Sequence, residues 1–142
     1  MFKLIAFVTV FMLSSFSYAD HHVLSMEVRQ PTTELKITSI TVGGDFTVIN
    51  AEAQMSVYGR VYMTFTLAYN SERNGGTYTF RARSYLDEET AFSASGVGVW
   101  NRDGKKLSMH QLVNASNGDI NYGKATIDPL NRTGTLVLYA SN

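Results

Sequence analysis

The stretch GVGVWNRDGKKLSMHQLV, residues 96–113, decides how the fold is interpreted. It contains the only Trp of the chain and an Asp103-Gly104 step. Asp-Gly steps favour tight hairpins because both residues tolerate a positive φ, which matches the twist of the flanking strands. Lys106, Ser108 and His110 then alternate with Leu107, Met109 and Gln111. The stretch therefore predicts two antiparallel strands joined by a turn at Asn101–Gly104.

Similar turn sequences recur on both sides of this hairpin, at intervals of about fourteen residues. They include Asn74-Gly75, Asp87-Glu88, Asn117-Gly118 and Asp128-Pro129. The segments between them are rich in Val, Thr, Tyr, Phe and Ile, which suit a pleated, half-buried surface. In RVYMTFTLAYN, residues 60–70, every second residue is apolar. A period of two is typical of strands and not of helices.

These patterns predict an all-β chain with about eight strands, over residues 34–43, 45–57, 59–70, 76–86, 90–101, 105–115, 118–128 and 133–141. Consecutive strands with short turns form an antiparallel meander, and eight of them can close into an up-and-down barrel without exposed edges. An open β-sandwich is the alternative. The interior of an eight-stranded barrel admits packed side chains or one small ligand.

The first 19 residues are typical of a cleavable signal peptide. Lys3 forms the positive region, Leu4–Leu13 the apolar region, and Ser17 and Ala19 the small residues before a cleavage site. We therefore expect a secreted or periplasmic protein. Residues 20–33 are a leader that can add a short strand across one end, and residues 34–142 are the barrel domain. The chain contains no cysteine, which fits an exported bacterial protein.

The charge balance argues against two classes of partner. The chain has 12 basic and 12 acidic residues, so it offers no long-range attraction for nucleic acid or for an anionic membrane. The loops are uniformly short, and the closing stretch GTLVLYASN does not end on an aromatic residue. We therefore expect no stable membrane insertion.

The apolar strand faces predict a ligand site inside the barrel. The first functional hypothesis is a non-enzymatic binder of a small apolar or amphipathic molecule, with candidate ligand-binding residues Met63, Phe65, Phe80, Trp100, Met109 and His110. His110 belongs to this set if its strand face points inward; otherwise it lies on the surface. One alternative is a cyclase or isomerase that uses the cavity, although no catalytic motif is evident. The other is a structural or interaction protein whose barrel is filled.

Arg81, Arg83 and Tyr85 share one strand face. If that face points inward, two guanidinium groups form a site for a carboxylate or a phosphate. If it points outward, they form a solvated face. We favour the outward orientation because the opposite face is more apolar.

A metal hypothesis concerns the new N-terminus, Asp20-His21-His22, that cleavage after Ala19 creates. The free amine, two backbone amides and the imidazole of His22 can bind Cu(II) or Ni(II) in a plane, and His21 offers a second imidazole. A solvated tail is the alternative. We expect no other cofactor.

The last 70 or so residues resemble small bacterial calycin-like or allene-oxide-cyclase-like barrels. The resemblance rests on a spacing of glycine, aromatic and turn residues, namely Gly96, Gly98, Trp100, Gly104, Lys105, Ser116-Asn117-Gly118, Gly123, Asp128 and Pro129. It implies a barrel whose interior can hold an occupant. No active-site residue of a cyclase matches a position in this chain, so the resemblance implies no catalytic residue.

Overall fold

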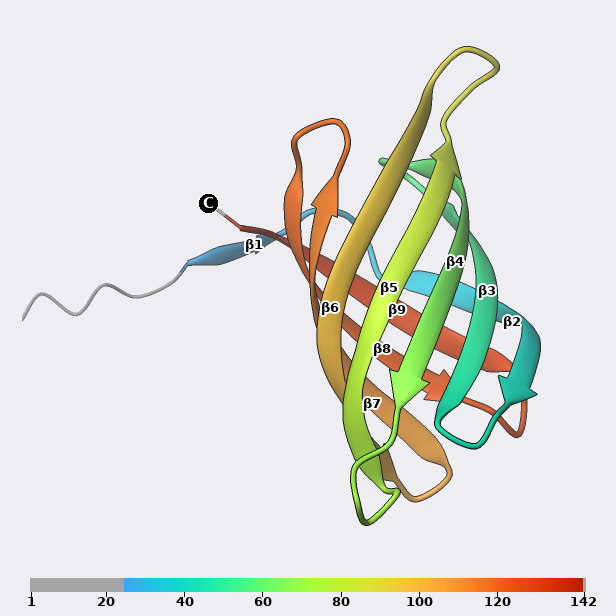
Figure 1. Cartoon of the computed structure of the whole chain (residues 1–142). Helices are drawn as coiled ribbons and strands as arrows, with labels where there is room; N and C mark the ends of the chain where they lie inside the picture. Colours follow the sequence, from blue (N-terminus) through green and yellow to red (C-terminus); the bar gives the residue numbers. More distant parts are fainter. Residues whose placement is uncertain (1–24, 142) are drawn as a thin grey trace, which may run out of the picture.

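The computed structural model describes residues 25–141, which form an all-β antiparallel fold (Figure 1). The strands are β1 (Met26–Val28), β2 (Thr33–Val42), β3 (Phe46–Met55), β4 (Gly59–Ala68), β5 (Gly75–Tyr85), β6 (Ala91–Asp103), β7 (Lys106–Ala115), β8 (Ile120–Asp128) and β9 (Thr133–Ser141). No helix long and apolar enough to cross a membrane occurs within residues 25–141. The signal peptide expected over residues 1–19 lies outside the described residues.

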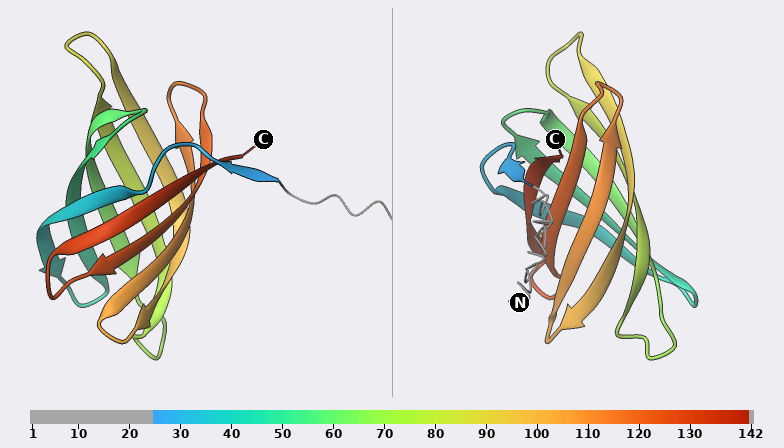
Figure 2. Two further views of the ribbon diagram at one scale, coloured as in Figure 1. Left: turned by 180° about the vertical axis from the view of Figure 1, so that it is seen from behind. Right: turned by 90° about the vertical axis from the view of Figure 1, so that its left-hand side faces the viewer.

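The sheet closes because β9 pairs along both of its edges. One edge pairs with β8, from Thr133 opposite Asp128 to Ala140 opposite Asn121. The other edge pairs first with β2 and then, over its last residues, with β1. Strands β2–β9 therefore form a closed eight-stranded barrel, which confirms the predicted fold class over the open sandwich (Figure 2). β1 lies within the leader, but it extends the sheet along the end of β9 and does not cross an end of the barrel.

The hairpin of β6 and β7 is confirmed, but its turn lies later than the sequence predicts. β6 continues to pair with β7 as far as Asp103 opposite Lys106, so the predicted turn at Asn101–Gly104 is wrong and only Gly104 and Lys105 form the loop. Gly104 has a φ of 62°, as the first residue of a two-residue type II′ loop requires. Glycine adopts this backbone conformation without the strain that a side chain introduces.

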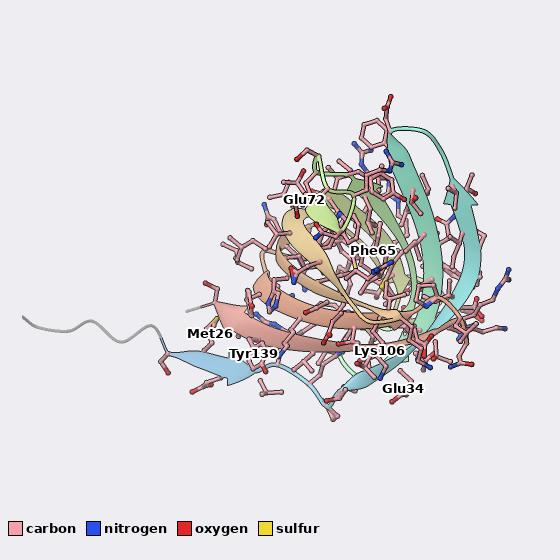
Figure 3. The ribbon with its side chains drawn as sticks, turned by 90° about the horizontal axis from the view of Figure 1, so that it is seen from below. Met26, Glu34, Phe65, Glu72, Lys106 and Tyr139 are labelled. Atoms are coloured by element: carbon pink, nitrogen blue, oxygen red, sulfur yellow. The ribbon has the colours of Figure 1, made fainter. Side chains whose placement is uncertain are left out.

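The inward residues of the strands form one hydrophobic core. In β4 the predicted alternation is confirmed, because Val61, Met63, Phe65 and Leu67 are buried while the residues between them are more exposed. Phe65 lies inside the ring of strands, with its ring centroid 5.2 Å from that of Phe80 (Figure 3). Fully burying such a side chain contributes about 1.5–3 kcal/mol to folding.

Tilted and twisted strands generally give a closed barrel the form of a hyperboloid, whose wall is saddle-shaped. Such a wall curves outward around its circumference but inward along the strands. A glycine allows close packing inside this wall. The ring of Tyr78 lies over Gly98, where an added Cβ would stand 2.6 Å from the Tyr78 Cζ atom. A side chain from β5 thus fills the space where β6 has none.

One end of the barrel is closed by aromatic side chains. Trp100 Nε1 donates a hydrogen bond of 2.9 Å to the carbonyl oxygen of Ala68. Its ring packs edge-on against Tyr69, with 5.6 Å between the ring centroids. The only Trp of the chain therefore closes the end at which the β4–β5 loop lies.

The opposite end is closed by a polar network. The Tyr58 hydroxyl donates to Asp119 Oδ2 at 2.6 Å and accepts from Asn121 Nδ2 at 2.9 Å. Arg29, from the leader, donates to Asn121 and lies 3.6 Å from an Asp119 carboxylate oxygen. Burial, followed by the hydrogen bond to Asp119, raises the pKa of Tyr58 to about 12. The same hydrogen bond is the largest cause that lowers the pKa of Asp119.

Candidate functional site

Five of the six predicted ligand-binding residues lie inside the barrel. Met63, Phe65, Phe80, Trp100 and Met109 are each at most 5 % exposed. They pack against one another and against their neighbours as core side chains, and Phe65 illustrates this in Figure 3. The structure therefore brings these five residues together, but as the filling of the barrel.

His110 does not join them. It follows Met109 in β7, and successive side chains of a strand point to opposite faces. Met109 is fully buried, so His110 lies on the outer face, where its Nδ1 atom is hydrogen-bonded to the Tyr122 hydroxyl of β8. The sequence left two positions open for His110, inside the barrel or on its surface, and the structure places it on the surface.

The space left inside the barrel is small. A cavity of about 40 Å³ lies toward the end closed by the polar network, among Met55, Tyr58, Phe92, Gln111 and Leu138. A water molecule needs roughly 10–15 Å³ of such space, whereas pockets for drug-sized ligands measure about 300–1,000 Å³. The cavity thus has room for a few waters at most.

Gln111 is a buried polar residue that the ligand-site prediction misses. Its side chain is 2 % exposed and its Oε1 atom accepts a hydrogen bond of 3.0 Å from the Tyr78 hydroxyl. Its Nε2 atom has no hydrogen-bond partner among the described residues. The signal was present in the sequence, because Gln111 has the same strand parity as Met109 and therefore points inward.

A much larger hollow lies on the outer face and extends from β2 to β7. Its middle strands, β3 to β6, face the viewer in Figure 1. It measures about 760 Å³. We call it the arginine groove, and its polar lining consists of Thr38, Asn50, Tyr62, Thr64, Arg81, Arg83, Ser93, Ser95, Asn114 and Ser116. The remaining lining residues are Met63 and four alanines, so the lining carries no carboxylate, His or Cys.

The strand register builds the floor of this groove. One residue from each of five neighbouring strands, β3 to β7, lies directly opposite a residue of the next strand. In this order they are Asn50, Thr64, Arg81, Ser95 and Asn114. Thr64 donates a hydrogen bond of 2.7 Å to the Asn50 side chain. Four short hydroxyl and amide side chains thus run across the strands in one row, with Arg81 at its centre.

The two arginines of the groove have no acidic partner. Both are exposed on the outer face, as we expect from the more apolar opposite face, and neither forms an ion pair with any residue in the range 25–141. Glu52 lies on the same outer surface, but it is engaged 3.2 Å from Arg60 and 3.5 Å from Lys36. The groove therefore carries two positive charges that are free to meet a ligand.

No family model, curated protein or solved structure matches this chain. The calycin-like or allene-oxide-cyclase-like resemblance therefore stays a prediction, and the groove has to be interpreted from its own chemistry.

The metal hypothesis cannot be placed on this structure, since His21 and His22 lie outside the described residues. Within the part of the chain that the structure describes, no three His, Cys, Asp or Glu side chains are grouped as metal ligands would be. The Cu(II) or Ni(II) site stays a prediction from the sequence.

Proposed function

We propose that this chain is a non-enzymatic binding protein, secreted or periplasmic, that holds a small anionic molecule in the arginine groove. The observation that carries the proposal is the pair Arg81 and Arg83, whose charges have no acidic partner among residues 25–141 and border a hollow of about 760 Å³. Binding without catalysis is proposed because the lining offers no His, Cys or carboxylate as nucleophile or base.

The chemistry of the groove suits an anion that also accepts or donates hydrogen bonds. A guanidinium group presents a rigid fork of N–H donors that matches a carboxylate or phosphate in two parallel bonds. Arg81 and Arg83 stand two residues apart on one strand face, roughly 7 Å along the strand. The hydroxyls of Ser93 and Ser95 and the Asn114 amide lie beside them to complete the contacts.

Size favours the groove over the interior. The cavity inside the barrel is about 40 Å³, so an apolar ligand bound there needs a larger space than this structure contains. The groove lies within the range of about 300–1,000 Å³ that small-molecule sites occupy. An interior ligand stays a prediction, and the filled-barrel alternative agrees better with the packing around Phe65.

The test is a titration of the purified chain with acetate and with inorganic phosphate, followed by backbone amide NMR. We expect shifts at residues 81, 83, 95 and 114, with a dissociation constant on the order of 1 mM that weakens at high salt. The double variant Arg81→Ala/Arg83→Ala is expected to bind at least about tenfold more weakly, since a charge-assisted hydrogen bond contributes about 1.5–3 kcal/mol.

The matched control is Arg102→Ala/Lys106→Ala, which removes the same charge from two exposed positions outside the groove. It is expected to bind both anions as the unaltered chain does. Equal weakening by both double variants would show a general effect of net charge and would overturn the proposal, as would the absence of any shift in the groove.

A further inference from the structure

The arginine groove continues into a second hollow on the outer face. This hollow, of about 420 Å³, shares Arg81, Ser95 and Asn114 with the arginine groove. Its own wall is formed by Val97, Leu112 and Ile120. We call it the apolar hollow, and the shared residues make the two hollows one continuous surface across β5, β6, β7 and β8.

The three aliphatic side chains of the apolar hollow are unusually exposed. Val97, Leu112 and Ile120 have 64 %, 58 % and 51 % of their surface accessible. Val97 lies directly opposite Leu112, and Ile120 lies opposite Asn114, the next outward residue of β7 after Leu112. Single exposed apolar residues are ordinary on protein surfaces, but a contiguous group beside a charged site marks a binding surface.

Resting on the proposed function, we propose that the ligand is an amphipath with one anionic head and one alkyl chain. The head meets Arg81 and Arg83, and the chain lies across β6 and β7 against Val97, Leu112 and Ile120. From Arg81 to Ile120 the register crosses three neighbouring pairs of strands, roughly 14 Å at about 4.8 Å for each pair. That length suits an extended chain of medium length.

The occupant is a free molecule and not a membrane surface. The aliphatic side chains line a hollow of about 420 Å³, so a single chain can lie inside it, whereas a flat bilayer contacts only its rim. The charges complement an anionic head group, since two guanidinium groups stand at one end of the path and no acidic residue lines either hollow. Each methylene that leaves water on the apolar wall then strengthens binding.

The test compares three probes of matched parts: octanoate, which has head and chain, acetate, which has only the head, and 1-octanol, which has only the chain. All are titrated as monomers and followed by amide NMR at residues 97, 112 and 120. We expect octanoate to bind at least about tenfold more tightly than acetate, because burial of several methylenes outweighs their immobilisation. We expect 1-octanol to bind at least about tenfold more weakly than octanoate, because it lacks the charge that Arg81 and Arg83 recognise.

Two variants assign the contributions. Val97→Thr/Leu112→Thr keeps strand-forming residues on the outer face and is expected to reduce octanoate binding to the level of acetate. Val42→Thr, at an exposed position outside both hollows, is the matched control and is expected to change nothing. Arg81→Ala/Arg83→Ala is expected to weaken acetate and octanoate alike.

The outcomes separate this inference from the proposed function. Equal binding of acetate and octanoate in the groove overturns the amphipath and leaves the anion site standing. Failure of acetate, octanoate and inorganic phosphate alike to bind overturns the proposed function itself. If 1-octanol binds as tightly as octanoate, or if sedimentation finds the chain on phosphatidylglycerol vesicles through Val97 and Leu112, the free anionic amphipath is the wrong occupant.

Discussion

Strand β5 carries two unlike surfaces on its two faces. Its inward residues Tyr78, Phe80 and Ala82 are buried in the core, whereas Arg81 and Arg83 between and beyond them are exposed in the arginine groove. The two sets differ only in parity along one strand. The inner face therefore contributes to stability, whereas the outer face provides the proposed binding site. We expect that mutations can change one property without the other.

The largest expected effect comes from the inner face. Phe65→Ala removes a fully buried ring at the centre of the core, and we expect it to lower the free energy of unfolding by about 3–5 kcal/mol. Thr66→Ala, the next residue on the outer face, is expected to stay within about 0.5 kcal/mol. Urea denaturation measures both.

The comparison breaks if Thr66→Ala destabilises the chain as much as Phe65→Ala does. It also breaks if the folded fraction of Phe65→Ala no longer binds acetate, because the outer face would then depend on the packing inside. Retained binding in that variant would confirm that the two faces act independently.

A smaller effect is expected from the polar pair inside the core. Tyr78→Phe and Gln111→Met each leave a buried polar group without its hydrogen-bond partner, so each is expected to cost about 1–3 kcal/mol. The double variant removes both polar groups together and is expected to be nearly neutral, because replacing both partners by apolar side chains leaves none unsatisfied. Denaturation of the four proteins gives the coupling free energy.

Strict additivity of the two single effects would contradict this account. It would mean that each group finds another partner when its neighbour is removed, for example a water in the cavity of about 40 Å³ beside Gln111. Additivity would thus indicate that this cavity holds water within hydrogen-bonding distance of the remaining polar group.

Parity along the strands made the two faces predictable from the sequence. It places Phe65 and Phe80 inside and Arg81 outside, and the structure agrees. The same parity separates His110 from Met109, and the predicted ligand set, which contains both, overlooked it, since adjacent residues of a strand cannot share a face. The regular turns likewise predicted the meander, because closure needs only enough strands with short connections.

The remaining features depend on three-dimensional shape that no local pattern encodes. The arginine groove lies where Arg81 and four short polar residues align across five strands, and this alignment is a consequence of register. The volume of the inner cavity depends on how large residues such as Tyr78 fill the space over Gly98. The turn at Gly104 moved because pairing continued through Asp103.

The smallest expected effect comes from the polar network that closes one end between the two faces. The pKa of Asp119 is lower in the folded chain than its ordinary value, chiefly because Tyr58 donates a hydrogen bond to it. A depressed carboxyl pKa contributes stability above the unfolded value, about 3.9, and this contribution is lost as pH falls toward the folded value. We expect the loss to stay below about 1 kcal/mol, because solvent screens the partly exposed carboxylate.

Tyr58→Phe isolates this contribution. The variant lacks the hydroxyl, so the pKa of Asp119 rises toward its ordinary value, and stability should fall less steeply below about pH 4 than in the unaltered chain. The pKa values of Asp87 and Asp128 are also lowered, to about 2 for Asp128, but their contributions cancel between the two proteins because neither contacts Tyr58. Denaturation midpoints between about pH 3 and pH 7 measure the difference. Parallel curves would mean that the hydrogen bond from Tyr58 to Asp119 contributes no pH-dependent stability to this end.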